Sequence, residues 1–350
     1  MTLTDHGHAG EVGIRYLPRE VVARRSRDLD PCAIVAAALV AHAEGRTDLP
    51  DEAYLGWTAP DGAAARSLAM PGALCGDGGR RLGVKIINGS LGNPDRGLAR
   101  AQGLVMLFDE LTGRIDCVLE AARISATRTA AVTIVTARAL CAEPPRTLAM
   151  LGCGALARAH LDLASRYLPS VERVRIMDRD PARCTALGAE LRMLDRWQVE
   201  EAPDPIACIE GADLVVTCTN TDHGYLPFGA FAPGAVLAHV SLDDALPELV
   251  HRAGLVLVDD WTLVSTDRRR LLGRMIAAGE LVGPHAPRPG AGVARVHATL
   301  GDILTGRHPG RAAASDVVLS NPFGMAILDV ALASAIADVD DESGVWRLPV

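Results

Sequence analysis

The stretch that most constrains the fold is residues 146–179, where a glycine turn separates a strand pattern from a helix pattern. Thr147 to Leu151 is a short apolar run of strand length, and Gly152 to Ala157 reads G-x-G-x-x-A. An amphipathic helix pattern follows, and then a second strand pattern, 174–177, which stops at Asp178. This order of strand, glycine turn, helix, strand and acid is typical of a βαβ unit that binds a dinucleotide.

Each position of the glycine turn has its own physical reason. Gly152 permits the tight turn, Gly154 lets a pyrophosphate approach the backbone, and the small Ala157 allows the helix to pack close to the strand. Ala155 and Leu156 open the helix, whose free N–H groups and partial positive charge attract phosphates. The sequence therefore predicts a cofactor site at Gly152, Gly154, Ala155 and Leu156.

Asp178 is the residue that favours NAD over NADP. A carboxylate at this place can accept hydrogen bonds from the adenosine ribose and would repel a 2′-phosphate. It lies 178 − 152 = 26 residues after the first glycine, somewhat beyond the usual spacing of about 20. Arg179 and Arg175 weaken the preference, because either could accept a phosphate. Thr219, at the end of the apolar run 212–219, is a further expected cofactor contact.

The composition excludes several classes of protein. The chain has 350 residues, which suggests about two domains. A net charge of −8 argues against a nucleic-acid partner, and no apolar run approaches the ~20 residues that span a bilayer. The eight cysteines form no C-x-x-C pair, which is typical of reduced thiols. We therefore expect a cytoplasmic protein with no nucleic-acid partner, no membrane partner and no metal site.

The order of the predicted elements indicates an α/β fold with two domains. The first hundred residues read as mostly β, including a strand from Arg66 that ends at Met70-Pro71. A long alanine-rich helix pattern, 125–140, leads into alternating strands and helices, which favour a parallel sheet. We expect a β-rich domain made of residues 1–125 with 300–350, and a Rossmann-type dinucleotide-binding domain made of residues 126–299.

Three basic side chains stand in surroundings that favour a functional role. Lys85 is centred in the strand pattern Gly83 to Ile87, where it must reach water or meet an anion. Arg128 lies on a helix of small residues, and its planar guanidinium suits the capture of a carboxylate. Arg66 is a weaker candidate for the same task. The alternative for each of them is a solvated side chain on the surface of a strand or helix.

Two neighbouring acids, Asp243 and Asp244, follow a strand pattern that ends at Val240. Ligands of open α/β sheets lie beyond the carboxyl ends of the strands, so an acid here is well placed for proton transfer. The sequence does not separate the two aspartates, and either could instead cap a helix that begins at Ala245.

Short motifs along the chain occur in the order found in one known family. They are Met70-Pro71, Gly83-Val84-Lys85, Asn93-Pro94, Leu111-Thr112-Gly113, Arg128-Thr129-Ala130-Ala131 and the glycine turn. As a set, over about residues 12–340, they resemble the ornithine cyclodeaminase/mu-crystallin family. The resemblance implies an NAD-dependent enzyme with a small amino-acid substrate, a Rossmann-type domain, and a β-rich domain for substrate binding and homodimer formation.

Two stretches, 241–249 and 320–332, resemble one branch of this family. Enzymes of that branch use NAD to oxidise N-((2S)-2-amino-2-carboxyethyl)-L-glutamate. Water then releases L-2,3-diaminopropionate and 2-oxoglutarate, in siderophore or peptide-antibiotic biosynthesis. Ornithine cyclodeaminases typically carry Gly-Gly-Asp where this chain has Val240-Ser241-Leu242, which speaks against ornithine as the substrate.

The resemblance also implies roles for individual residues. Lys85 matches the lysine that relays a proton or activates water, while Arg128 and Arg66 match arginines that bind substrate carboxylates. Asp244 matches the usual acid or base, whereas Asp243 stands where the branch has an arginine. Two alternatives stay open. One is an ornithine cyclodeaminase, another imino-acid reductase or an amino-acid dehydrogenase on the same scaffold. The other is a non-catalytic, nucleotide-dependent ligand-binding protein similar to mu-crystallin.

Overall fold

The computed structural model describes residues 13–76, 79–287 and 290–349 and divides the chain into two compact units. Unit 1 consists of Met1–Asp30, Thr47–Ser125 and Asp329–Val350, and unit 2 of Pro31–Arg46 and Ala126–Leu328. Residues 1–12, which the predicted first domain includes, lie outside the described residues. Within the described ranges, no helix has the length and apolar character that crossing a membrane requires.

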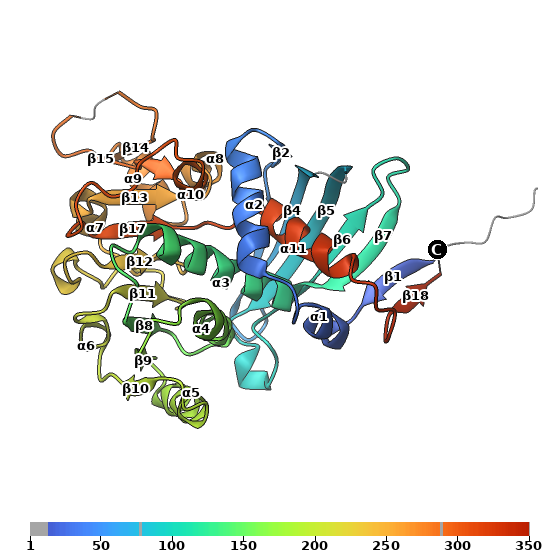
Figure 1. The fold of residues 1–350 in the computed structure, drawn as a ribbon, viewed down its shortest axis with the longest axis horizontal. Coiled ribbons are helices and arrows are strands. Elements are labelled where there is room, and N and C mark those ends of the chain that lie inside the picture. Colours follow the sequence, from blue (N-terminus) through green and yellow to red (C-terminus); the bar gives the residue numbers. More distant parts are fainter. Residues whose placement is uncertain (1–12, 77–78, 288–289, 350) are drawn as a thin grey trace, which may run out of the picture. The chain divides into compact units, whose positions relative to one another are not determined.

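Unit 1 is built on an eight-stranded sheet in the order β18-β1-β7-β6-β5-β4-β2, with β3 also paired to β4 (Figure 1). The β1–β7 pair is parallel, and the pairs from β7 to β2 are antiparallel. The strands are β1 (Ile14–Leu17), β2 (Thr47–Asp48), β3 (Ala53–Thr58), β4 (Ala64–Gly76), β5 (Gly79–Ser90), β6 (Ala101–Phe108), β7 (Ile115–Glu120) and β18 (Trp346–Leu348). The helical segments are α1 (Arg19–Arg25), the short turn η1 (Pro94–Arg96) and most of α11 (Ala326–Ala337).

The register of this sheet puts two predicted site residues on one face. Met70 on β4 is directly opposite Lys85 on β5, so both side chains point to the same side. Arg66 lies four residues before Met70 on the same strand and therefore faces that side as well. Helix α11 covers this face, since a Cβ on Gly83 would lie 3.2 Å from Val330.

Strand β4 does not end at Met70-Pro71, as the sequence suggested, but continues to Gly76. Pro71 pairs with Val84 of β5 on one side. On its other side Pro71 has no partner strand among the described residues, because the pairing of β4 with β3 ends at Ala69 and its pairing with β2 begins at Ala73. The missing N–H of the proline therefore removes no ladder hydrogen bond, and the strand passes through it.

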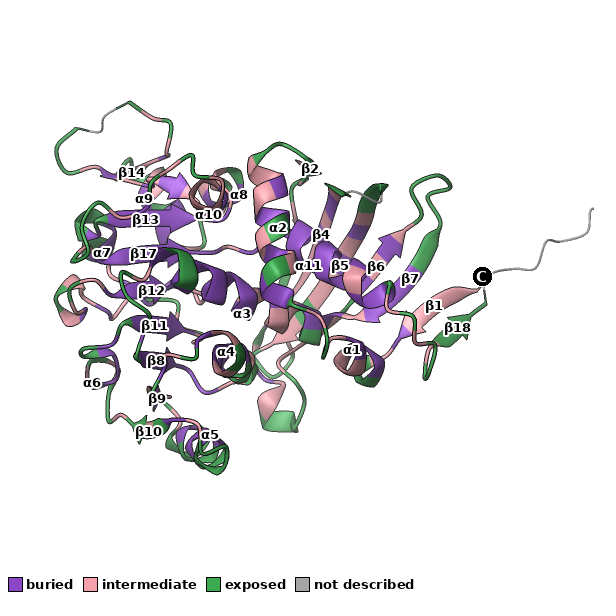
Figure 2. Ribbon diagram, in the orientation of Figure 1, coloured by how far each residue is buried: buried purple, intermediate pink, exposed green. Residues whose placement is uncertain are grey.

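Unit 2 contains an eight-stranded parallel sheet in the order β10-β9-β8-β11-β12-β17-β13-β16 (Figure 1). Its strands are β8 (Thr147–Leu151), β9 (Arg173–Met177), β10 (Gln198–Glu201), β11 (Leu214–Thr217), β12 (Val236–Ala238), β13 (Leu255–Val258), β16 (Ala298–Thr299) and β17 (Val318–Asn321). A small second sheet pairs β14 (Leu281–Val282) with β15 (Ala294–Arg295). Figure 2 shows the central strands of the large sheet in the colour of buried residues, as a parallel sheet covered on both faces requires.

The helices of unit 2 connect these strands. They are α2 (Pro31–Ala43), α3 (Ala121–Leu140, mostly in this unit), α4 (Ala155–Tyr167), α5 (Pro181–Met193), α6 (Pro205–Ile209), η2 (Phe228–Ala230), α7 (Pro247–Arg252), α8 (Trp261–Thr266), α9 (Leu271–Ala277) and α10 (Leu300–Leu304). The α/β fold class with a Rossmann-type sheet, predicted from the sequence, is therefore confirmed.

The domain boundaries differ from the predicted ones at two places. Residues 300–328 belong to unit 2, because the fully buried strand β17 lies between β12 and β13 in the parallel sheet. Residues 31–46 also belong to unit 2, although they precede the β-rich region. Helix α2 packs closely on α10, where a Cβ on Gly301 would lie 2.8 Å from the Leu39 carbonyl oxygen. Both differences arise from contacts between segments far apart in the sequence.

Candidate functional site

The glycine turn after β8 has the shape that a dinucleotide requires. Gly152 has a φ of +95°, and a Cβ there would lie 2.6 Å from the Cys218 carbonyl oxygen, so only glycine fits. Gly154 precedes α4, and no described atom lies within 4 Å of the position that its Cβ would take. Ala155 and Leu156 form the first turn of α4, whose N–H groups have no partners within the helix. The residues present thus fit a bound pyrophosphate.

Asp178 follows β9 and holds the glycine turn in place. Its Oδ2 atom accepts the N–H of Cys153 at 2.7 Å, and its Oδ1 atom accepts the N–H of Asp180 at 2.9 Å. The side chain is half-buried, and Arg179 beside it is exposed. The acid therefore lies next to the turn, as the βαβ pattern predicts, while its contact with a ribose stays a prediction.

Asp244 is buried within a group of hydroxyl donors at the carboxyl end of the parallel sheet. Its Oδ1 atom accepts from Thr219 at 2.7 Å and from the Tyr225 hydroxyl at 2.8 Å, and its Oδ2 atom accepts from Ser241 at 2.5 Å. Burial alone raises the pKa of this carboxyl group, but the hydrogen bonds that it accepts, among them those from Ser241 and Thr219, hold the pKa below its ordinary value. The carboxylate is therefore ionised throughout the neutral range.

The hydroxyl groups, rather than the imidazole, account for the stability of the Asp244 carboxylate. The Nε2 atom of His239 lies 3.6 Å from Asp244 Oδ2 and already accepts the backbone N–H of Asp244 at 2.9 Å, so it has no proton to give. Burial and the nearby carboxylate also raise the pKa of Tyr225, so its phenol keeps its proton and donates it to Asp244. The sequence analysis missed Tyr225 and Ser241, and it assigned Thr219 to the cofactor rather than to this aspartate.

Asp243 has entirely different surroundings from its neighbour. Its two oxygens accept from Arg270 at 2.8 Å and from Arg274 at 2.9 Å, and its side chain is 2% exposed. Arg270 and Arg274 flank the start of α9, so this double ion pair fixes the 241–244 turn to that helix. Such an arrangement suits a structural role.

Lys85 forms a buried ion pair in unit 1. Its Nζ atom donates to Asp329 Oδ2 at 2.6 Å, and the two side chains are 1% and 0% exposed. Asp329 lies in the first turn of α11, 244 positions away in the sequence, and the sequence analysis did not find it. Lys85 thus does not reach solvent as an edge-strand lysine would, and a carboxylate on α11 fixes its ammonium group beneath the sheet.

Arg128 lies almost buried on α3, with its guanidinium against Gly324 of unit 2. A Cβ on Gly324 would lie 2.6 Å from Arg128 Nη1, and this glycine has a φ of +100°. The buried Asp259 carboxylate holds the loop in that conformation, since it accepts the N–H of Phe323 at 2.9 Å and that of Gly324 at 2.6 Å. The guanidinium is therefore a positioned group on a rigid support and not a solvated arginine on a helix surface.

The structure thus brings together only part of the predicted set, unit by unit. In unit 2 it joins Thr219 to Asp244 and gives Asp243 different partners from Asp244. In unit 1 it puts Arg66 and Lys85 on one face of the sheet. Among the described residues, no three His, Cys, Asp or Glu side chains are grouped as a metal site would need.

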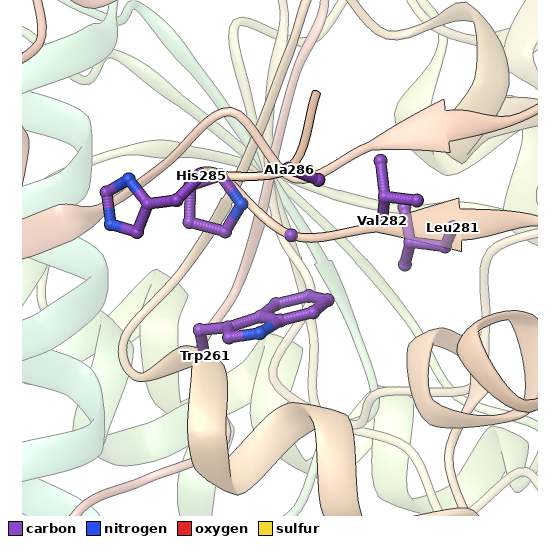
Figure 3. A pocket seen from close by; sticks show the side chains of 7 residues that line it. Trp261, Leu281, Val282, His285 and Ala286 are labelled. Carbon is purple, nitrogen blue, oxygen red and sulfur yellow. The ribbon is translucent and has the colours of Figure 1, made fainter. Parts of the chain in front are cut away.

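A separate hollow of about 390 Å³ lies in unit 2, beside the indole of Trp261 (Figure 3). Strand β14 and the segment after it complete its wall, with Val282, Pro284 and His285 among the lining residues. The hollow contains none of the residues predicted for the cofactor or the substrate. We therefore do not assign it to the candidate site.

The sequence pattern of the ornithine cyclodeaminase/mu-crystallin family matches residues 17–343. The chain belongs to the ornithine cyclodeaminase/mu-crystallin family. A relative from Staphylococcus aureus, N-((2S)-2-amino-2-carboxyethyl)-L-glutamate dehydrogenase, is 30% identical over 85% of this chain and 85% of its own length. The Δ1-pyrroline-2-carboxylate reductase of Paracoccus denitrificans is 28% identical over 75% of this chain and 80% of its own.

Solved structures show the same architecture. The crystal structure of CmnK superposes with a TM-score of 0.87 at 36% sequence identity and covers 97% of this chain and 98% of CmnK. The Δ1-pyrroline-2-carboxylate reductase of Thermococcus litoralis, solved with NADH and L-proline, gives a TM-score of 0.83 at 20% identity over 95% of this chain and 99% of its own. The family predicted from short motifs is therefore confirmed, and the fold agrees over almost the entire chain.

Proposed function

We propose that this chain oxidises N-((2S)-2-amino-2-carboxyethyl)-L-glutamate with NAD, and that water then releases L-2,3-diaminopropionate and 2-oxoglutarate. The observation that carries the proposal is the similarity to the Staphylococcus aureus dehydrogenase named for this substrate, which extends over 85% of both chains. A substrate with three carboxylates and a secondary amine also suits a site with positioned cations and an ionised aspartate.

The coarser part of this assignment rests on the whole family. The chain is an enzyme, an NAD-dependent oxidoreductase that acts on a CH–NH bond, like the relatives that match it. When bound, NAD accepts the hydride from the substrate. Gly152, Gly154, Ala155 and Leu156 would hold its pyrophosphate, and Asp178 its adenosine ribose. Arg179, exposed beside Asp178, would be a further contact for the cofactor.

The chemistry divides among the polar side chains as follows. The glutamyl Cα gives up a hydride and the amine nitrogen a proton, which leaves a C=N bond that water attacks. Arg66 and Arg128 would bind substrate carboxylates. Asp244, which stays ionised at neutral pH, would orient the amine or the water by accepting their protons. A carboxyl group whose pKa is lowered is a poor proton donor at neutral pH, so proton return to the leaving amine would fall to Lys85.

The assignment of Asp244 rather than Asp243 follows from their surroundings. Asp243 is neutralised by two arginines, whereas Asp244 carries an uncancelled charge among neutral hydroxyl groups. Only the second can act on a cationic or proton-donating ligand without first breaking an ion pair. We therefore assign Asp243 to the stability of the turn.

We further propose a homodimer formed through unit 1. The sheet face opposite Lys85 carries Leu55, Trp57 and Leu104, which are 64%, 46% and 40% exposed. Apolar side chains gathered on a sheet face mark an interaction surface, and a second copy of the chain offers the same surface in return. Trp57→Glu should convert the dimer to a monomer in light scattering; a wild-type chain that is already monomeric would refute the proposal.

The product would serve siderophore or peptide-antibiotic biosynthesis, as in the branch that the chain resembles. The eight cysteines are thiols and not disulfides, which fits a reducing, cytoplasmic location. A neighbouring gene for a PLP-dependent synthase that joins phosphoserine to glutamate would support this placement.

The direct test is NADH formation, followed by its absorbance, with purified protein, NAD and the proposed substrate, and with ornithine in a parallel reaction. We expect NADH and 2-oxoglutarate with the first compound alone. Proline and ammonia from ornithine, without net NADH, would instead identify a cyclodeaminase. No product from either compound would contradict the proposed substrate and favour another amino acid or a binding protein.

A further inference from the structure

His239 is a buried histidine that the proposed mechanism does not use, yet it contacts the backbone of Asp244. It directly follows β12, and its side chain is fully buried. Its Nε2 atom accepts the N–H of Asp244 at 2.9 Å and lies 3.3 Å from the N–H of Ala245. Its Nδ1 atom lies 2.9 Å from Oδ1 of Asn321, the last residue of the adjacent strand β17.

These contacts define the protonation of the ring. An Nε2 atom that accepts two backbone N–H groups carries no proton, so the proton of the neutral ring is on Nδ1. That proton is donated to Asn321, whose amide oxygen therefore selects the tautomer. The neighbouring strands β12 and β17 thus end in a matched pair of side chains that presents one acceptor to the turn after β12.

The turn that receives this acceptor is strained. Leu242 has a φ of +74° although it is not glycine, and it is buried. A residue of this kind is strained in the left-handed region and persists there only when its surroundings hold it. Ser241 is fixed on one side by its N–H bond to the Thr217 carbonyl at 3.1 Å. His239 fixes Asp244 and Ala245 on the other side.

We propose that His239 and Asn321 are positioning residues that hold the strained turn so that the Asp244 carboxylate stays aligned with its hydroxyl donors and with the substrate. The inference rests on the proposed role of Asp244. Without the imidazole, two buried N–H groups lose their acceptor and the turn can relax toward a negative φ at Leu242. A displacement of the carboxylate by about 1 Å can lower the rate by about 10²-fold.

The test compares substitutions that remove or restore the acceptor. His239→Ala removes it, whereas His239→Gln can place an amide oxygen close to the former position of Nε2. His297→Ala is the matched control, since His297 Nδ1 also accepts a backbone N–H, that of Val256 at 2.9 Å, in the same unit and away from Asp244. For each variant we would measure kcat, KM, NAD affinity and thermal unfolding.

We expect His239→Ala to lower kcat by about 10- to 100-fold, with NAD affinity within about twofold of wild type. His239→Gln should recover most of this loss. His297→Ala should lose comparable thermal stability while keeping kcat. If His239→Ala and His297→Ala lose stability alike and both keep kcat, His239 is merely structural and the inference is wrong.

A second measurement does not depend on activity. The ¹⁵N chemical shifts of the His239 ring in the intact protein should show a neutral ring protonated on Nδ1, and Asn321→Leu should abolish that preference. A ring protonated on Nε2 would overturn the inference directly. Asp244→Asn, assayed alongside, separates the two ideas. Full turnover in Asp244→Asn would contradict the proposed role of Asp244. If Asp244→Asn lost turnover and His239→Ala kept it, the role of Asp244 would stand and only the positioning role of His239 would be contradicted.

Discussion

Asp244 in unit 2 and Asp329 in unit 1 are both fully buried aspartates, but opposite kinds of partner satisfy them. Asp244 accepts hydrogen bonds from neutral hydroxyl groups, and Asp329 accepts one from the ammonium group of Lys85 at 2.6 Å. Hydroxyl donors stabilise a carboxylate without cancelling its charge, whereas an ion pair neutralises it. The comparison indicates that the charge of Asp244 is available to a ligand, while that of Asp329 holds a lysine in position.

The largest expected effect comes from removing the uncancelled charge. Asp244→Asn should lower kcat by about 10³-fold, within the range for groups that move a proton, which corresponds to roughly 4 kcal/mol. The amide oxygen can still accept from Thr219 and Tyr225, so NAD affinity should change little. Steady-state kinetics with NAD titration measures both. A kcat near that of wild type would show that the charge has no catalytic part.

The next effect tests the opposite kind of site. Asp329→Asn removes the carboxylate to which the buried Lys85 ammonium donates, and breaking such a pair costs about 3–5 kcal/mol. Urea unfolding should therefore show a large loss of stability. The double variant Lys85→Met with Asp329→Asn is the control and should recover much of that loss, because it removes the buried ammonium together with the carboxylate. Equal stability of the single variant and wild type would mean that the pair is not an ion pair in solution.

The pH dependence of stability sharpens the comparison further. The hydrogen bonds from its hydroxyl donors hold the folded-state pKa of Asp244 below the value of about 3.9 for an unfolded aspartate. The ionised group therefore stabilises the fold above about pH 4, and this contribution is lost as the pH falls below that value and the carboxylate takes up a proton. The free energy of unfolding, measured with urea between neutral pH and pH 3, should fall less steeply for Asp244→Asn than for wild type. Parallel curves for the two proteins would contradict the lowered pKa.

The sequence predicted what depends on neighbouring residues. The glycine turn, its flanking strands and Asp178 all lie within a stretch of 33 residues, 147–179, and each has a local physical reason that a reader can recognise. Lys85 and Arg128 were also found locally, as charged residues among apolar or small ones. The sequence did not predict which side chains these residues contact.

The partners that decide each residue's role lie far away in the chain. Asp329 is 244 positions from Lys85, and Asn321 is 82 positions from His239. Strand β17 enters the middle of the parallel sheet after most of that sheet has already appeared in the sequence, which is why the predicted boundary at residue 300 was too early. Strand pairing between distant segments leaves no periodic signal, so the sequence could name candidates without assigning their contacts.

The smallest effect is expected at Asp243, next to the residue with the largest. The sequence could not separate Asp243 from Asp244, but the arginines that Asp243 binds are 29% and 43% exposed. When Asp243→Ala removes their partner, Arg270 and Arg274 can turn to water, so the loss of stability should be only about 1 kcal/mol. The kcat should fall far less than in Asp244→Asn, because the Asp244 carboxylate keeps its charge and its hydroxyl donors. Paired kinetics and urea unfolding of Asp243→Ala and Asp244→Asn test this directly. If Asp243→Ala lost turnover and Asp244→Asn kept it, a carboxylate neutralised by arginines would be the reactive one, and the distinction between hydroxyl-held and ion-paired aspartates would fail.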